Sequence, residues 1–314
     1  MAAGLGLSGL ELNTGGFLPP VHVPNIDQIL ESDTARDDYL GIFQEARVGI
    51  AGLNCNGNPL HPNPLIGEKH SSEVFRSIKL ANRLGQNRVV TMSGLPGAEP
   101  SATHPNWIVN AWNSASLDVL DFQWAVAEKF WRRANALAAD LDVKVALELH
   151  PQNLVFNVPS VHEFLERTNA THIGVELDAS HLFWQQMDPV EVVRSLGEIV
   201  LHAAAKDVRV NARNASLVGV LDNSFRRLSA DEKRTNLGEN EWVNEWPKQA
   251  AWEFVAVGKG HPVEYWAEFI RACNEVDSEM WLNIEHEDVS MAPIEGLAFA
   301  CETLFSASEL ASSE

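Results

Sequence analysis

Carboxylate and imidazole side chains end four apolar stretches in the second half of this 314-residue sequence. Each stretch is rich in apolar and β-branched residues, which is typical of a buried parallel strand. The residues at or near their carboxyl ends are Glu148, His150, Asp178, His202 and Glu285. Burying one isolated carboxylate is costly, so several that converge are best explained by a divalent cation between them. The pattern predicts a metal site at one rim of a parallel sheet.

Proton transfer is a second chemistry that these positions suggest. Glu148 and His150 share one face of their strand, and His181 begins the turn after Asp178. Imidazoles there suit proton transfer at neutral pH or hydrogen bonding to sugar hydroxyls. The alternative is that they only cap or support neighbouring groups. Lys206 is a candidate to stabilise an oxyanion, and the alternative is an ordinary exposed lysine.

Three more residues are expected to contact the substrate. Asn54 ends another strand, His61 follows soon after it, and His261 lies in a glycine-flanked turn that could close over the pocket. The remaining histidines that were considered have no such positional argument and are expected at the surface: His70, His104, His162 and His172.

Composition restricts the class of protein. The formal charge of −20 argues against nucleic acid or an anionic membrane as a partner. No apolar run approaches the ~20 residues of a membrane span, and the first residues lack the pattern of a signal peptide. The 3 cysteines are widely spaced and indicate neither a disulfide framework nor a cysteine zinc site. We therefore expect a cytoplasmic enzyme that acts on a small molecule.

Strand and helix patterns alternate along the chain, which predicts a parallel sheet. Strands are expected near residues 7–12, 47–53, 88–93, 143–149, 172–178, 199–205 and 280–286. Helices are expected over 33–45, 71–84, 116–139 and 263–276, and two more begin at a Ser160 capping box and at Asp188-Pro189. No strand is followed by a glycine-rich phosphate loop. A closed (β/α)₈ barrel is therefore expected, in a single domain of residues 1–314.

The strands found in the sequence are one fewer than such a barrel needs. We expect the first strand to be missing or replaced, because Ala2–Gly6 looks like the end of a helix that leads into residues 7–12. A long polar insert, residues 208–260, precedes the last strand. An insert of this length is usually a lid or an interface.

Seven short motifs resemble those of xylose-isomerase-like TIM barrels, the sugar phosphate isomerase and epimerase superfamily. They are Asn58–Pro62, Thr91–Gly94, Leu147–Pro151, Leu177–Leu182, Lys206–Asp207, Gly258–His261 and Ile284–Asp288. The resemblance extends over residues 5–305. It implies a (β/α)₈ barrel with a divalent metal.

The resemblance also implies a set of metal ligands. Besides a histidine they are Glu148, Asp178 and Glu285. Carboxylate and imidazole ligands suit Mn²⁺, with Mg²⁺, Co²⁺ or Zn²⁺ as alternatives. Relatives commonly carry the histidine two residues before the lysine, where this chain has Ala204. His202 has the same strand parity but lies about 6.6 Å lower along a strand. It is either a ligand of a shifted metal or a core histidine.

Proton abstraction next to a sugar carbonyl is the activity that the resemblance implies. The candidate catalytic groups are Glu148, His150, His181, Lys206 and Glu285. The long insert, the Glu148–His150 pair and the 10 tryptophans favour a C-glycoside deglycosidase catalytic subunit, a lyase on 3-keto-glycosides. That reading implies an oligomer and a small β-rich partner subunit. The alternatives are a sugar or inositol isomerase, epimerase or dehydratase, and a non-catalytic barrel that serves as a binding subunit.

Overall fold

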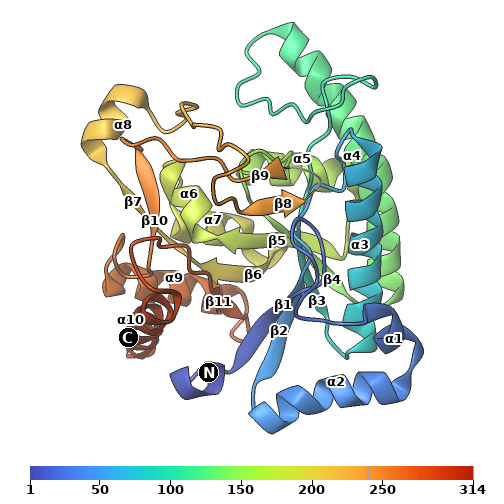
Figure 1. The fold of residues 1–314 in the computed structure, drawn as a ribbon, viewed down its shortest axis with the longest axis vertical. Helices are drawn as coiled ribbons and strands as arrows, with labels where there is room; N and C mark the ends of the chain where they lie inside the picture. Colours follow the sequence, from blue (N-terminus) through green and yellow to red (C-terminus); the bar gives the residue numbers. More distant parts are fainter. Residues whose placement is uncertain (239–240, 314) are drawn as a thin grey trace. The chain divides into compact units, whose positions relative to one another are not determined.

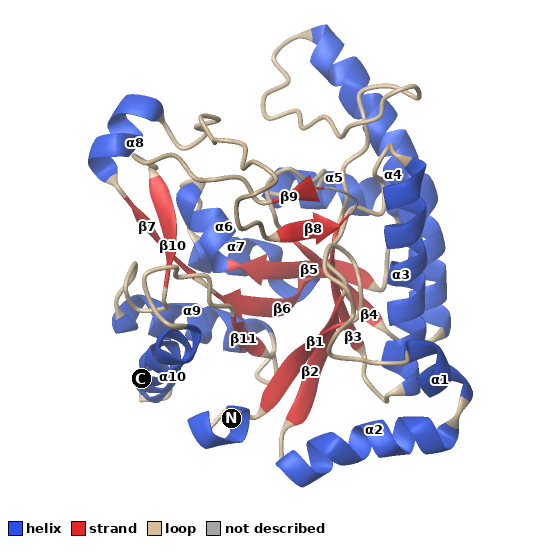
Figure 2. Cartoon of the chain, viewed as in Figure 1, coloured by secondary structure: helices blue, strands red, loops and turns tan. Residues whose placement is uncertain are grey.

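A seven-stranded parallel sheet is the central element of the computed structural model, which describes residues 1–238 and 241–313 (Figures 1 and 2). Its strand order is β1-β2-β3-β4-β5-β6-β11. The strands are β1 (Gly9–Asn13), β2 (Gly49–Asn54), β3 (Arg88–Met92), β4 (Lys144–Glu148), β5 (Ile173–Asp178), β6 (Val200–Ala205) and β11 (Leu282–Ile284). All seven strands predicted from the sequence are confirmed, although the last is shorter than expected.

The long insert lies between β6 and β11, as predicted. It contains β7 (Asp207–Val210), α8 (Ala212–Val218), β8 (Asn236–Gly238), β9 (Glu241–Trp242) and β10 (Trp252–Val255). β10 pairs with β7 in a separate antiparallel sheet, and in the described chain the main sheet passes from β6 directly to β11. The sequence suggested that the strand missing from an eight-stranded barrel is the first one. In the described chain, it is the segment between β6 and β11 that contributes no strand to the main sheet. Residues 239–240 of the insert lie outside the described residues.

Helices follow most strands. They are α1 (Ile26–Glu31), α2 (Asp33–Ala46), α3 (Pro64–Arg83), α4 (Ser114–Asp140), α5 (Val158–Thr168), α6 (Ala179–Trp184), α7 (Pro189–Leu196), α9 (Val263–Val276) and α10 (Pro293–Ala311). Two short 3₁₀ helices, Ala2–Leu5 and Gly197–Ile199, precede β1 and β6. The predicted α2, α4 and α9 are confirmed within two residues at each end.

Two predicted helix starts were wrong because the capping residue lies further upstream. α3 begins at Pro64, where the side chain of Asn63 accepts a hydrogen bond from the Leu65 amide. α5 begins at Val158 rather than at a Ser160 cap. Asn157 is its N-cap and Ser160 is the third helical residue of that capping box. By contrast, Asp188 caps α7 as predicted.

The chain divides into two compact units by the density of its internal contacts. The first comprises Met1–Glu176 with Ile199–His202, and the second comprises Leu177–Glu198 with the chain from Ala203 onward. In the first unit, α3 and α4 pack beside each other and against β3 and β4, around the fully buried Trp131. In the second unit, α9 packs on α7 and α10.

Strand pairing places Glu148 and Glu176 side by side in the sheet of the first unit. Met92 pairs with Glu148, and Glu148 pairs with Glu176 on the neighbouring strand. Because parallel strands in register present paired residues to the same face, the two carboxylates lie at one level of the sheet. None of the helices in the described chain has the length and apolar character needed to cross a membrane.

Candidate active site

The carboxyl end of β4 carries a buried carboxylate followed by an imidazole. Glu148 is the last residue of the strand and is buried, and its Oε2 accepts a hydrogen bond of 2.5 Å from the Asn56 side-chain amide. His150 is half-buried, and its Nδ1 lies 2.5 Å from the Pro151 carbonyl oxygen, to which it donates. That bond fixes Nδ1 as the protonated ring nitrogen.

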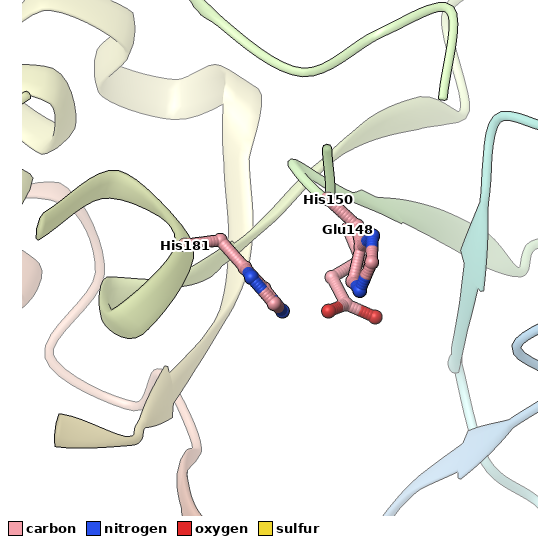
Figure 3. Close-up of side chains that lie close together, drawn as sticks. All are labelled: Glu148, His150 and His181. Carbon is pink, nitrogen blue, oxygen red and sulfur yellow. The ribbon is translucent and has the colours of Figure 1, made fainter. Parts of the chain in front are cut away.

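Glu148 and His150, both drawn in Figure 3, place ligand-type atoms at the end of β4. A carboxylate oxygen and an imidazole nitrogen are donors that suit a divalent transition metal. The chemistry of these donors fits the metal that the sequence predicted.

The first turn of α6 holds Asp178 and His181. Asp178 ends β5 and caps the helix, because its Oδ1 accepts a hydrogen bond of 2.8 Å from the Ser180 amide. Its Oδ2 lies 3.3 Å from Nε2 of His181. Burial is the main reason that the pKa of His181 is lowered to about 4; the Asp178 carboxylate acts in the opposite direction, and the Lys206 ammonium contributes to the lowering. His181 is therefore neutral at pH 7 and able to accept a proton or bind a metal.

Lys206 lies among carboxylates of its own unit. Its side chain is only 5% exposed, and its Nζ donates to Glu285 at 3.2 Å and to Glu287 at 2.7 Å. The same Nζ lies 3.7 Å from Oδ2 of Asp178 and 4.6 Å from the centre of the Phe254 ring. The sequence left open whether Lys206 is an exposed lysine, and the structure shows that it is buried.

His202 belongs to a second group of ligand-type side chains, deeper in the first unit. Its Nε2 lies 3.0 Å from Oε2 of Glu11, and ligand atoms of Glu11, Glu176 and His202 all lie within 4.8 Å of one another. The imidazole of His202 is fully buried. Its role as a ligand of the predicted metal stays a prediction.

The three predicted substrate contacts make structural hydrogen bonds. Asn54 donates to Glu11 at 2.7 Å. His61 is buried, and its Nδ1 accepts from the Asn63 amide at the start of α3. His261 lies 2.7 Å from Asp207 and stacks on Phe183 at 3.7 Å between ring centres. Their contact with a substrate remains a prediction.

Several polar residues of these groups were missed by sequence reasoning. Glu176 is two residues before Asp178, so strand alternation places both side chains on one face of β5, and this parity could have identified it. Glu11 lies within the short β1, where the same rule applies. Asn56 and Glu287 follow strand ends and carry no comparable pattern. His70 was expected at the surface, but that prediction was wrong: His70 is buried, and its Nδ1 accepts a hydrogen bond from the Asn58 amide.

A family model for the xylose isomerase-like TIM barrel matches residues 1–305 of this chain. The chain belongs to this family. A curated relative, the uncharacterized protein YfiH of Bacillus subtilis (strain 168), is 33% identical over 307 residues, which cover 96% of this chain and 91% of the relative. The predicted fold class is thereby confirmed.

Two solved structures show the same fold at low sequence identity. One is the probable 3-DHS dehydratase AsbF of Bacillus anthracis, with a TM-score of 0.62 and 18% identity over 97% of this chain and 90% of that one. The other is a xylose isomerase-like TIM barrel protein of Mycobacterium smegmatis in complex with magnesium. It has a TM-score of 0.61 and 13% identity over 99% of this chain and 87% of that one.

Proposed function

We propose that this protein is a divalent-metal-dependent enzyme that moves a proton at the carbon next to a sugar carbonyl. The observation that carries the proposal is the buried carboxylate of Glu148 beside the imidazole of His150 at the end of β4 (Figure 3). Membership of the xylose isomerase-like family supports the substrate class. A bound ion, with Mn²⁺ as the proposed metal, would polarise the carbonyl oxygen and acidify the neighbouring C–H bond.

The protein's own residues divide the remaining work. Asn56 holds the Glu148 carboxylate by a hydrogen bond, which fixes its orientation toward a ligand. His181 is neutral at pH 7 because burial lowers its pKa to about 4, so its imidazole can accept a proton. Lys206 lies 3.7 Å from the Asp178 carboxylate, and Asp178 contacts His181, so the lysine helps to hold that imidazole in place.

A second candidate activity is elimination of an aromatic aglycone from a 3-keto-glycoside, as in C-glycoside deglycosidases. The observation that favours it is an aromatic cluster at the insert. Trp184 stacks on Trp252 at 4.7 Å, and Trp252 contacts the rings of Trp246 and Phe254. Phe254 in turn lies beside Lys206. Aromatic rings bind flat aromatic ligands by stacking, so this cluster suits an aglycone. A small β-rich partner subunit belongs to this proposal.

Solvent deuterium exchange tests the common step of both activities. The metal-loaded protein is incubated in ²H₂O with a ketohexose or with a 3-keto-glycoside, and deuterium at the carbon next to the carbonyl is followed by NMR. We expect exchange that EDTA stops and Mn²⁺ restores. A new sugar epimer would identify an isomerase or epimerase, and release of the aglycone would identify the lyase. Exchange into none of these sugars would overturn the proposal in favour of a binding barrel.

Two matched variants test whether the deuterium exchange depends on Glu148. Glu148→Gln keeps the size of the side chain but removes its charge, so we expect exchange to fall at least 100-fold. Glu128→Gln makes the same chemical change on α4, where Glu128 forms a partly exposed ion pair with Arg132. It should exchange at the rate of the unmodified protein. Equal rates in the two variants would contradict the assignment of Glu148.

A further inference from the structure

We propose that the ammonium of Lys206, rather than a metal ion, is the cation that neutralises the strand-end carboxylates of Asp178 and Glu285. The sequence resemblance assigns both carboxylates to a metal. This inference rests on the proposed function only in assuming that an ion binds elsewhere, at Glu148 and His150 of β4. The contacts that carry it all lie within the second unit.

The first step is geometric. Nζ of Lys206 lies 3.2 Å from Oε2 of Glu285 and 3.7 Å from Oδ2 of Asp178. It reaches Glu287 as well, at 2.7 Å. A single positive charge is thus shared by three carboxylates. Metal ions of this class bind carboxylate oxygens at about 2.0–2.2 Å, so an ion shared by the Asp178 and Glu285 oxygens would lie close to the ammonium.

The second step is electrostatic. A divalent ion and an ammonium at the same carboxylates repel each other, and burial strengthens that repulsion because the local dielectric constant is low. Lys206 is only 5% exposed, so its ammonium is poorly placed to move into water. The Phe254 ring lies 4.6 Å from Nζ and favours a cation at this position. The ammonium therefore competes with a metal for the same two carboxylates.

The third step concerns the strand that carries the lysine. The resemblance expects a histidine ligand at Ala204, and the three residues before Lys206 are all alanines. Ala204 is fully buried and pairs with Asn283 of β11. A methyl group supplies no ligand atom. The chain has therefore lost the imidazole that would complete a metal site with Asp178 and Glu285, and it retains the lysine two residues further along.

The consequence is a fixed cation in place of an exchangeable one. Lys206 is a positioning residue in this arrangement, because it holds Asp178, and Asp178 contacts His181. A metal between these carboxylates would present open coordination positions to a substrate. An ammonium presents only N–H donors, and three carboxylates already share them. The ion of the proposed function is then held without Asp178 and Glu285.

Mn²⁺ titration of EDTA-stripped protein, by calorimetry and by thermal unfolding, tests this assignment. Asp178→Asn and Glu285→Gln should each keep the Mn²⁺ affinity of the unmodified protein within about threefold. Loss of a metal ligand would cost far more, since even partners that only support a ligand are worth 10–100-fold. A drop of 100-fold or more in either variant would overturn the proposal.

Removal of the lysine gives the complementary result. Lys206→Met should gain Mn²⁺ binding, seen as an additional equivalent or a larger Mn²⁺-induced rise in Tm, and the gain should vanish in the double variant with Asp178→Asn. Lys129→Met changes an exposed lysine of α4 and should gain nothing. A folded Lys206→Met variant with no gain would overturn the proposal. If Lys206→Met does not fold, Asp178→Asn and Glu285→Gln still decide.

The two proposals fail in different ways. If the unmodified protein binds no Mn²⁺, the ion of the proposed function is contradicted. The gain in Lys206→Met and its loss in the double variant would still support the role of the lysine.

Discussion

The ends of β4 and β6 use the same kind of residue in opposite ways. At the end of β4, the Glu148 carboxylate is held by the neutral amide of Asn56 and is followed two residues later by the imidazole of His150. At the end of β6, carboxylates surround the ammonium of Lys206. The first arrangement is composed of metal-type donors, whereas the second already contains its cation. Carboxylates at strand ends therefore do not identify a metal site until the nearest positive charge is known.

The largest effect is expected for a change at His181, the proposed proton acceptor, whose imidazole is neutral at pH 7. Replacement by glutamine keeps a polar side chain but removes the basic ring nitrogen. We expect deuterium exchange to fall by about 10²–10⁴-fold, the usual contribution of general acid–base catalysis. The initial exchange rate of His181→Gln would be compared with that of His162→Gln, a change at an exposed position of α5. A loss of less than threefold would remove His181 from the catalytic groups.

Removing the charge of Lys206 should cost stability as well as change metal binding. Lys206→Met leaves the buried Asp178 carboxylate and the more exposed Glu285 and Glu287 without the ammonium that they share, and breaking a buried ion pair typically costs about 3–5 kcal/mol. Urea unfolding at low salt measures the free energy of unfolding. Lys129→Met at the surface should change it by less than about 0.5 kcal/mol. If the two variants were equally stable, the ammonium would not be the cation of this cluster.

His70 is a buried histidine that is not among the proposed catalytic groups. Its pKa is lowered to about 4, mainly by burial and in part by the adjacent Lys69. In the unfolded chain the pKa returns to about 6.5. Between these values the unfolded state binds more protons, so the free energy of unfolding should fall as the pH drops from about 6.5 to 4, by at most about 3 kcal/mol. The contribution is complete above pH 6.5.

Unfolding of His70→Gln across this pH range measures the effect. The variant should lose part of the pH dependence while its deuterium exchange stays within threefold of the unmodified protein. An unchanged pH dependence would contradict the buried, neutral imidazole at this position.

The smallest expected effect tests whether the β4 site depends on the helix that follows it. The side chain of Asn157 accepts a hydrogen bond of 3.0 Å from the Ser160 amide at the start of α5. Asn157→Ala should lower the free energy of unfolding by about 1 kcal/mol. Mn²⁺ affinity should stay unchanged, because the ligands come from strand ends. A loss of affinity beyond threefold would mean that the helix start orients the ligands.

Strands and rim residues were predictable because strand patterns are local. The apolar stretches before Glu148, Asp178 and Glu285 identified their strands, and the capping residue Asp188 identified the start of α7. Helix starts at Asn63 and Asn157 were missed because asparagine caps are common in loops as well. The pairing of β10 with β7 was not predictable, since it depends on contacts between distant segments.

The composition of the site was harder to predict than its location. Sequence spacing placed Lys206 one residue beyond β6 but could not show that its side chain is buried against carboxylates. Likewise the partner of His202, Glu11, is 191 positions away, because 202 − 11 = 191. Which charges meet depends on the fold, whereas which residues lie at strand ends depends mainly on local pattern.

An anomalous difference map from crystals grown with Mn²⁺ tests the central claim most directly. The account predicts a peak at Glu148 and His150, with the Lys206 ammonium still within hydrogen-bonding distance of Glu285. A peak shared by the carboxylates of Asp178 and Glu285, with Lys206 displaced from them, would contradict it.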